Sequence, residues 1–447
     1  MKLADYVRNP QEEAQALRGM LFTQYLGGSL ASAMVNMTQP LAVTMPYLSQ
    51  WGGALKAAGR MRGALADVLK KTTGDSRLDA ALKKAEEVGI VAPQEVHQLM
   101  AQAQGRGALR AGDGTTAGNL AAKAANVTSK IALAWGKPFA AAEQFNRRVT
   151  FIAAYRTAVA EGIADPARFA EEAIRDTQFV YNKGNKPQRA RGAIGATLLT
   201  FKQYSISYME LMHRMATTGG AEGKKAALFS LAMLFLMSGA GGIPFMGDAE
   251  DVLDGIMQRL GYSFSSKQTR RQFFIDLLGA DGAAFVERGV SGLPGVPIDV
   301  AGRLGMGNLI PGTGLLTKKQ DYGCDVGELL GPARDLAQRA FQGAGQVLSG
   351  KPLEGISTAS PTAVRNVAKA FDMYQTGMYR DQRGRKVIDA EGYDALVKAI
   401  GFQPSSVAQV QEANATQQNL IGQNKLAKTE LADAMAEAVF ERDTDKQ

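Results

Sequence analysis

Two long stretches without a single charged side chain stand out in the hydropathy pattern of this chain. Residues 19–55 form the first and residues 226–247 the second, whereas charged and apolar positions alternate at helical spacing in much of the remainder. No region shows several period-2 strands joined by hairpin turns. The pattern predicts an all-α fold, an extended multi-helix assembly with one or two short apolar helices.

The second uncharged run is helix-like from Ala226 to Met237 and is then interrupted by glycines and Pro244. A helix that spans hydrocarbon needs about 20 apolar residues, and shorter runs are typical of buried or re-entrant helices. Two interpretations stay open: a helix that spans lipid, and a helix that is buried in the protein or in its oligomer. We expect the run to be inaccessible in the soluble state, and to insert into a membrane or form a subunit contact only after a conformational trigger. The candidate membrane or subunit contacts are Leu228, Leu231, Leu234, Phe235, Leu236 and Phe245.

The first uncharged run is a weaker candidate for a membrane span. Gln24 and Gln39 are costly in hydrocarbon, and Pro40 and Pro46 interrupt the helix. We expect two half-helices with a kink between them.

A long helix is predicted to begin near residue 119, and its continuation over residues 136–160 is the best-patterned stretch of the chain. Val149 and Ile152 belong to its apolar stripe, and Arg148 and Arg156 fall on the same face. A buried guanidinium group requires a hydrogen-bonded carboxylate, or else it marks an anion-binding site. We expect buried structural ion pairs. The carboxylates proposed for them lie on the next helix, whose start is marked by Asp165 and Pro166; they are Glu172 and Asp176.

A basic loop follows, directly before an apolar helix. It can contact the phosphates of nucleic acid, lie against anionic lipid headgroups, or be a solvated loop without a ligand. The candidate phosphate or headgroup contacts are Lys183, Lys186, Arg189 and Arg191.

Breaks in composition predict four regions. They are an N-terminal helical region (1–118), a central helical core (119–290), a glycine- and proline-rich connector (291–325) and a C-terminal helical region with a loose tail (326–447). The connector lacks the Lys-Ser or Lys-Thr of a P-loop, so we expect a connecting loop rather than a phosphate cradle.

Composition excludes several classes of chemistry. Cys324 is the only cysteine, and the two histidines, His97 and His213, are far apart in sequence, so we expect no metal, no cofactor and no catalytic group. The net charge of +8 indicates only mild attraction to nucleic acid or anionic lipid. The first 18 residues lack the apolar stretch of a secretory signal, so we expect synthesis in a cytoplasm.

Several segments resemble the C-terminal helical region of very large phage and prophage polyvalent proteins, and the resemblance extends from about residue 15 to about residue 402. The segments are EQFNRRVTFIAAYR (143–156), TQFVYNKGNKPQRARGAIG (177–195), LLTFKQYSISYMELM (198–212), GIPFMGDAEDVLDGI (242–256), SGLPGVPIDVAGRLGMGNLIPGTG (291–314) and DMYQTGMYRDQRGRKV (372–387). Proteins of that group resemble internal virion and DNA-ejection proteins. The resemblance implies no catalytic residue.

The resemblance and the pattern together predict a virion-interior protein that forms an oligomeric conduit or accompanies the genome through the host envelope. The expected partners are other virion proteins, further copies of the chain, the host membrane and non-specifically bound DNA, with no small-molecule substrate. The alternative is a non-enzymatic helical scaffolding module that protects or organises incoming DNA. We expect no enzymatic activity, because no nucleophile, base and orienting group cluster in the sequence.

Overall fold

The computed structural model describes residues 15–91, 116–179, 202–262, 264–310, 313–316, 332–350, 352–381 and 384–444. In these ranges the chain is mostly helical, as the sequence predicts. Strands occur there only in two antiparallel pairs, so no sheet is larger than two strands. The chain forms two compact units, and each is described by itself.

The first unit comprises Met1–Leu234, Leu330–Lys369 and Lys398–Gly401, and the second comprises the rest of the chain. The boundary between Leu234 and Phe235 falls inside a helix that the uncharged run 226–247 forms. The four regions expected from the sequence stay a prediction.

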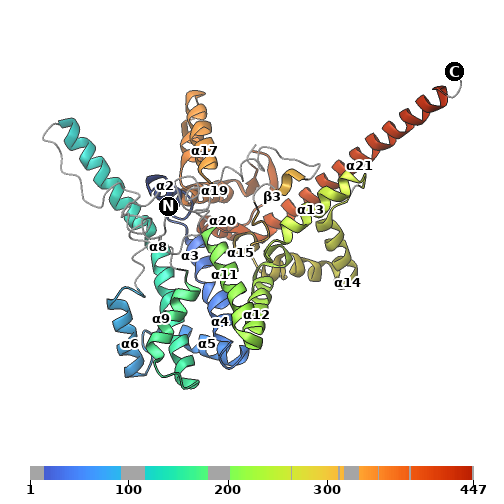
Figure 1. Cartoon of the computed structure of the whole chain (residues 1–447). Coiled ribbons are helices and arrows are strands. Elements are labelled where there is room, and N and C mark those ends of the chain that lie inside the picture. The colour runs from blue at the N-terminus through green and yellow to red at the C-terminus, as the bar shows by residue number, and fades with distance from the viewer. Residues whose placement is uncertain are drawn as a thin grey trace, which may run out of the picture. The chain divides into compact units, whose positions relative to one another are not determined.

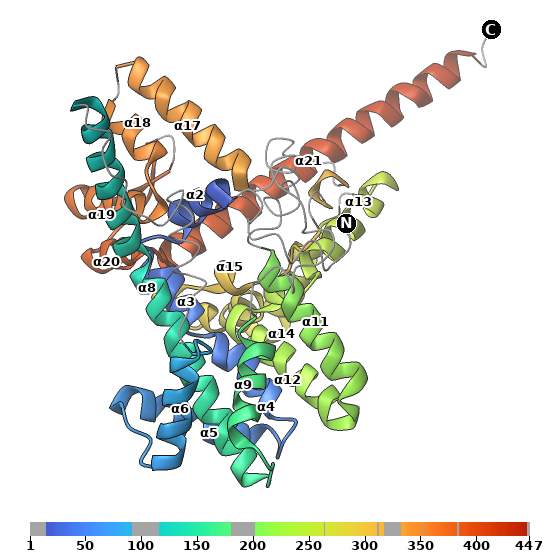
Figure 2. The same ribbon diagram turned by 60° about the vertical axis from the view of Figure 1, so that its left-hand side comes forward.

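In the first unit, several helices pack along the long helix α8 (Figures 1 and 2). They surround its C-terminal half, where Val149, Phe151 and Ile152 are fully buried. The helices at this core are α3 (Leu30–Asn36), α5 (Ala54–Lys70), α6 (Ser76–Glu87), α8 (Thr116–Ala160) and α9 (Pro166–Thr177). The other helices that begin in this unit are α2 (Gln15–Tyr25), the π-helical turn η1 (Pro40–Thr44), α4 (Met45–Leu48), α11 (Gln203–Thr218), α12 (Gly220–Ser238), α17 (Pro332–Leu348), α18 (Pro352–Ala359) and α19 (Thr362–Thr376).

The start of α9 follows directly from its sequence. The Asp165 side chain accepts a hydrogen bond from the Arg168 amide, and Pro166 occupies the first helical turn, where a missing N–H costs nothing. The predicted helix start is confirmed.

The segment Gln39–Ser49 of the first uncharged run is buried almost throughout. Its hydroxyl and amide groups are hydrogen-bonded in the core: Thr44 contacts the hydroxyls of Thr150 and Thr177 at 3.1 Å each, and the Gln178 amide donates to Thr44 and Thr150. A buried polar group is costly unless it is paired. These bonds therefore fix η1 and α4 against α8 and α9.

In the second unit, two strand pairs and a small core join segments that are distant in sequence. Strand β1 (Ile298–Asp299) pairs with β4 (Gln403–Pro404), and β2 (Met378–Arg380) pairs with β3 (Lys386–Asp389). Met373, Tyr379, Ala395 and Val407 form a buried cluster. The helices are η4 (Ala240–Gly242), α13 (Met246–Arg259), α14 (Ser266–Arg288), η5 (Gly289–Gly292), α15 (Ala301–Leu304), η6 (Thr313–Leu316), α20 (Gly392–Ile400) and α21 (Ser405–Thr444), the last of which runs as a single long helix to the C-terminal end (Figure 1).

Two glycines allow the chain to cross itself at the end of α12. Gly239 and Gly289 both have positive φ, and a Cβ on Gly289 would lie 2.4 Å from the Leu236 carbonyl oxygen. Only glycine tolerates both the conformation and the contact. The end of α14 is therefore held directly against the end of α12.

Candidate functional site

The uncharged run 226–247 forms most of α12 and continues through the turn into the start of α13, and its large apolar side chains are only partly covered. Leu234 is 2% exposed, whereas Leu228 is 68%, Leu236 is 43% and Phe245 is 40% exposed. Leu231 and Phe235 are partly buried. The expectation that the whole run is inaccessible is wrong.

The reason is that one face of α12, with Leu234 and several small side chains, is buried, whereas Leu228 and Leu236 lie on the other face. Ala226, Ala227 and Ser230 are buried, and they bring the helix backbone close to its neighbours. The Ser230 hydroxyl donates to the Ala42 carbonyl oxygen at 3.0 Å and lies 3.0 Å from the Tyr208 hydroxyl. With its polar group facing inward, the helix presents leucines outward. Among the described residues, no helix is both long enough and apolar enough to cross a membrane.

Helix α13 has the same inverted arrangement. Val252, Ile256 and Leu260 recur every four residues and are 41%, 52% and 66% exposed, respectively. The acidic residues Glu250 and Asp254, also four residues apart, face a cavity instead. A soluble helix normally buries its apolar side and exposes its charges. The arrangement here is the opposite of that pattern.

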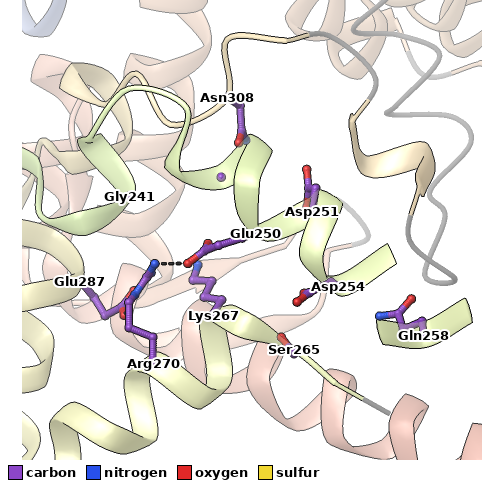
Figure 3. A pocket seen from close by; sticks show the side chains of 11 residues that line it. Gly241, Glu250, Asp251, Asp254, Gln258, Ser265, Lys267, Arg270, Glu287 and Asn308 are labelled. Atoms are coloured by element: carbon purple, nitrogen blue, oxygen red, sulfur yellow. Dashed lines mark hydrogen bonds and ion pairs between the residues drawn. The ribbon is translucent and has the colours of Figure 1, made fainter. Parts of the chain in front are cut away.

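The cavity in the second unit has a volume of about 380 Å³. Four carboxylates and two cationic groups surround it, as Figure 3 shows. The lining residues are Gly241, Gly247, Glu250, Asp251, Asp254, Gln258, Ser265, Lys267, Arg270, Glu287 and Asn308.

Arg270 is the central ion-pairing group of this cavity. Its guanidinium donates to both carboxylate oxygens of Glu287, at 2.9 and 2.8 Å, and also to Glu250 (Figure 3). Burial raises the pKa of Glu250 despite the attraction of Arg270, and the carboxylate of Glu287 raises it further. Burial by itself would lower the pKa of Arg270, but its bonds to Glu287 raise it, so the guanidinium stays charged.

Two further carboxylates organise the chain around the cavity. Buried Asp248 accepts hydrogen bonds from the Leu309 and Ile310 amides and from the Thr313 hydroxyl, which holds the segment after α15 against α13. Asp254 accepts from the Ser266 amide at 2.7 Å and from the Ser266 hydroxyl. An anion at a helix N-terminus is stabilised by the free amides there. Asp254 therefore fixes the corner between α13 and α14.

Chemically, the cavity is an anionic pocket of mixed charge. It favours cationic groups by charge, and Glu250 is the group best suited to retain a proton. In the part of the chain that the structure describes, no three His, Cys, Asp or Glu side chains are arranged to hold a metal ion. This cavity was not predicted from the sequence. Its only local signal is the repeat of Glu250, Asp254 and Gln258 opposite the apolar stripe of α13.

The predicted ion pairs form, but with other partners. Arg148 Nε lies 2.7 Å from Glu86, and Arg156 Nη2 lies 2.5 Å from Asp67. Both arginines point toward α5 and α6 rather than toward α9, so the predicted pairing with Glu172 or Asp176 is wrong. Their side chains are also only partly buried, at 38% and 31% exposure.

The two carboxylates of α9 have partners of their own. Glu172 pairs with Arg168 at the exposed surface, one helical turn away. Asp176 lies 2.8 Å from Arg214 and accepts a hydrogen bond from the Tyr47 hydroxyl at 3.0 Å. Burial, and then the charge of Asp176, raise the pKa of Tyr47. Asp176 thus joins α9 to α11 and α4.

The basic loop with Lys183, Lys186, Arg189 and Arg191 lies outside the described residues. Its predicted contact with phosphate or lipid headgroups stays a prediction. Comparisons of the chain with protein-family models, with curated proteins and with solved structures find no match.

Proposed function

We propose that this chain is a non-enzymatic virion-interior protein that assembles with further copies of itself and accompanies the genome during its delivery. The virion setting rests on the resemblance to phage and prophage polyvalent proteins. The assembly rests on the helices themselves, and one observation carries it: α13 exposes its apolar stripe and turns its acidic side inward.

The exposed stripe of α13 is costly for an isolated chain in water. Each large apolar side chain contributes about 1.5–3 kcal/mol when it is fully buried. Val252, Leu253 and Ile256 on α13, and Leu260 directly after it, are each more than two-fifths exposed, and Phe273 and Leu277 on α14 are more than half exposed. Large apolar side chains that recur along an exposed helix face favour an interaction site.

The outward leucines of α12 extend the same argument. Leu228 and Leu236 lie two helical turns apart, and the exposed Lys224 and Lys225 precede them. In the proposed assembly these side chains are covered by neighbouring subunits. The host membrane is the alternative partner for the same face, because basic residues beside apolar ones also suit anionic lipid.

Sedimentation velocity of the purified chain over a range of concentrations tests the assembly. The parent is expected to form species heavier than a monomer, and Ile256→Lys is expected to remain monomeric with unchanged helicity. Ala80→Lys, which adds the same charge at an exposed position of α6, is the matched control and should assemble like the parent.

Flotation with anionic vesicles separates the two partners. Self-assembly without flotation supports subunit contact, and flotation of a monomeric chain supports the membrane instead. A parent that is monomeric at every concentration and does not float contradicts the proposal.

A further inference from the structure

Helix α14 consists of two helical arms joined at Gly279. The φ and ψ angles of Gly279 are 75° and 178°, whereas the residues on either side are helical. This region of the backbone map is populated essentially by glycine alone. Figure 1 shows the two arms, residues 266–278 and residues 280–288, meeting at an angle. A Cβ on Gly279 would meet nothing within 4 Å, so packing does not require glycine here.

An ion pair joins the two arms directly. Arg270 of the first arm contacts both oxygens of Glu287 in the second arm, and only 14% and 4% of these side chains are exposed. In a straight helix, 17 residues separate two α-carbons by about 26 Å, because each residue adds about 1.5 Å. Two side chains cannot span that distance. The pair therefore exists only while α14 is bent.

A second bridge uses the adjacent residues. Arg271 of the first arm lies 3.2 Å from Glu412 of α21, and Arg288 of the second arm lies 3.7 Å from the same carboxylate. The two arms are therefore joined twice: directly by the Arg270–Glu287 pair, and indirectly by Arg271 and Arg288, which both lie close to Glu412.

The two arms differ in how firmly they are held. In the second arm Ala283 and Val286 are buried, and Gly289 at its end packs against the backbone of α12. In the first arm Leu277 and Leu278 are 62% and 52% exposed. Asp254 holds the first arm at its start, but no residue of this arm is buried. Few buried contacts are the mark of a segment that opens at low cost.

We infer that α14 is a hinged helix, with Gly279 as the hinge and the Arg270–Glu287 and Glu412 ion pairs as the latch. Releasing the latch swings the first arm toward a straight helix of 23 residues, about 35 Å long. The ion pairs of the latch keep α14 bent, although the residues on either side of Gly279 favour a continuous helix. This inference is independent of the proposed function, since it concerns one chain and requires no assembly.

Pulsed electron–electron spin resonance between two labels measures the bend. The labels are placed at exposed Thr269 and Val290 in a Cys324→Ser chain, which then has no other cysteine. Val290 lies two residues beyond the end of α14, and the helix from Thr269 to Arg288 spans about 29 Å when it is straight and less when it is bent. The parent is expected to give the shorter distance.

Charge exchange at the latch is the main test. Glu250→Gln serves as the background, because it removes the second carboxylate that faces Arg270. In that background Arg270→Glu places a second carboxylate opposite Glu287. Repulsion between the two is expected to lengthen the distance between the labels toward that of a straight helix. Adding Glu287→Arg restores an ion pair of opposite polarity and is expected to restore the short distance.

The hinge is tested by Gly279→Ala, which disfavours the bent conformation and is expected to lengthen the distance. Gly295→Ala, at a positive φ outside α14, is the matched control and should leave it unchanged. An Arg270→Glu chain with the parental distance overturns the inference, and so does a lengthening that Glu287→Arg does not reverse. A Gly279→Ala chain that stays bent also overturns it.

Discussion

Segments of the two uncharged stretches differ in how far their large apolar side chains are buried. In Gln39–Ser49, Val43 and Leu48 are fully buried, whereas in α12 Leu228 and Leu236 face outward. Hydropathy alone does not separate them, since both lack charge and both are helical. The difference lies in which side chains bring each helix close to its neighbours.

Buried polar groups explain much of the difference. The Gln39 side chain donates to the Thr177 carbonyl oxygen at 2.9 Å, and Thr44 belongs to the hydroxyl cluster beneath η1. In α12 the Ser230 hydroxyl has this role, on a buried face that also contains Ala226, Ala227, Leu234 and Ser238. A face of small residues permits close approach but leaves the large residues on the other side. Gln39–Ser49 therefore belongs to the core, whereas in the proposed assembly the outward side chains of α12 contact a partner.

The largest expected effect comes from placing one charge in each stretch. Leu48→Arg buries an unpaired guanidinium and is expected to cost at least about 3–5 kcal/mol, enough to unfold the first unit. Leu228→Arg places the same group in solvent, so its effect on stability is expected to lie within about 0.5 kcal/mol. Chemical denaturation followed by circular dichroism measures both.

Leu234→Arg tests the same difference, between a buried and an exposed leucine, within α12 itself. Leu234 is 2% exposed, so this change is expected to resemble Leu48→Arg rather than Leu228→Arg. If Leu228→Arg and Leu234→Arg destabilise the chain equally, the assignment of the two faces of α12 is wrong.

The next largest effect concerns the hydroxyl cluster. Thr44→Val leaves Thr150, Thr177 and Gln178 short of a buried partner and is expected to cost about 1–3 kcal/mol. Thr217→Val, at an exposed position of α11, is the control. Equal unfolding midpoints for the two variants would show that the polar groups do not hold η1 in place.

Tyr208 gives a pH-dependent test of the contact beneath α12. Burial raises the pKa of its hydroxyl to about 12, although the Ser230 hydroxyl lowers it slightly. Because the folded state holds this proton more tightly than the unfolded state, the stabilisation is complete below the ordinary pKa of about 10. It is lost as the pH rises from there through about 12. Tyrosinate absorbance during an alkaline titration should show a late component, to which Tyr47 also contributes, and Tyr208→Phe should reduce it. A titration unchanged by that variant contradicts the burial.

The smallest effect is expected at the ion pairs of α8. Arg156 and Asp67 are in contact, but the arginine side chain is 31% exposed and solvent weakens the interaction. Arg156→Ala is therefore expected to cost no more than about 1 kcal/mol. Thermal unfolding compared with Arg168→Ala, which breaks a fully surface-exposed pair, measures the difference. A loss of several kcal/mol would mean that α5 and α8 depend on this pair.

Local signals in the sequence were sufficient for some features and insufficient for others. Asp165 followed by Pro166 predicted where α9 begins, because capping depends on neighbouring residues alone. The partners of Arg148 and Arg156 depend on which helices cover that face of α8, and helical periodicity does not specify this. The residues that line the cavity are spread over the sequence from Gly241 to Asn308. Only the fold brings them together. Which side of α12 is buried depends likewise on its neighbours.

Hydroxyl-radical footprinting of the purified chain at low and high concentration tests most directly whether the outward helix faces are assembly surfaces. Leu48 should be protected at both concentrations, since the chain itself buries it. Leu228, Leu236 and Ile256 should react in the dilute sample and become protected in the concentrated one. If these three side chains react equally at both concentrations while larger species form, assembly uses another surface. The outward faces of α12 and α13 are then not assembly surfaces, which contradicts the account.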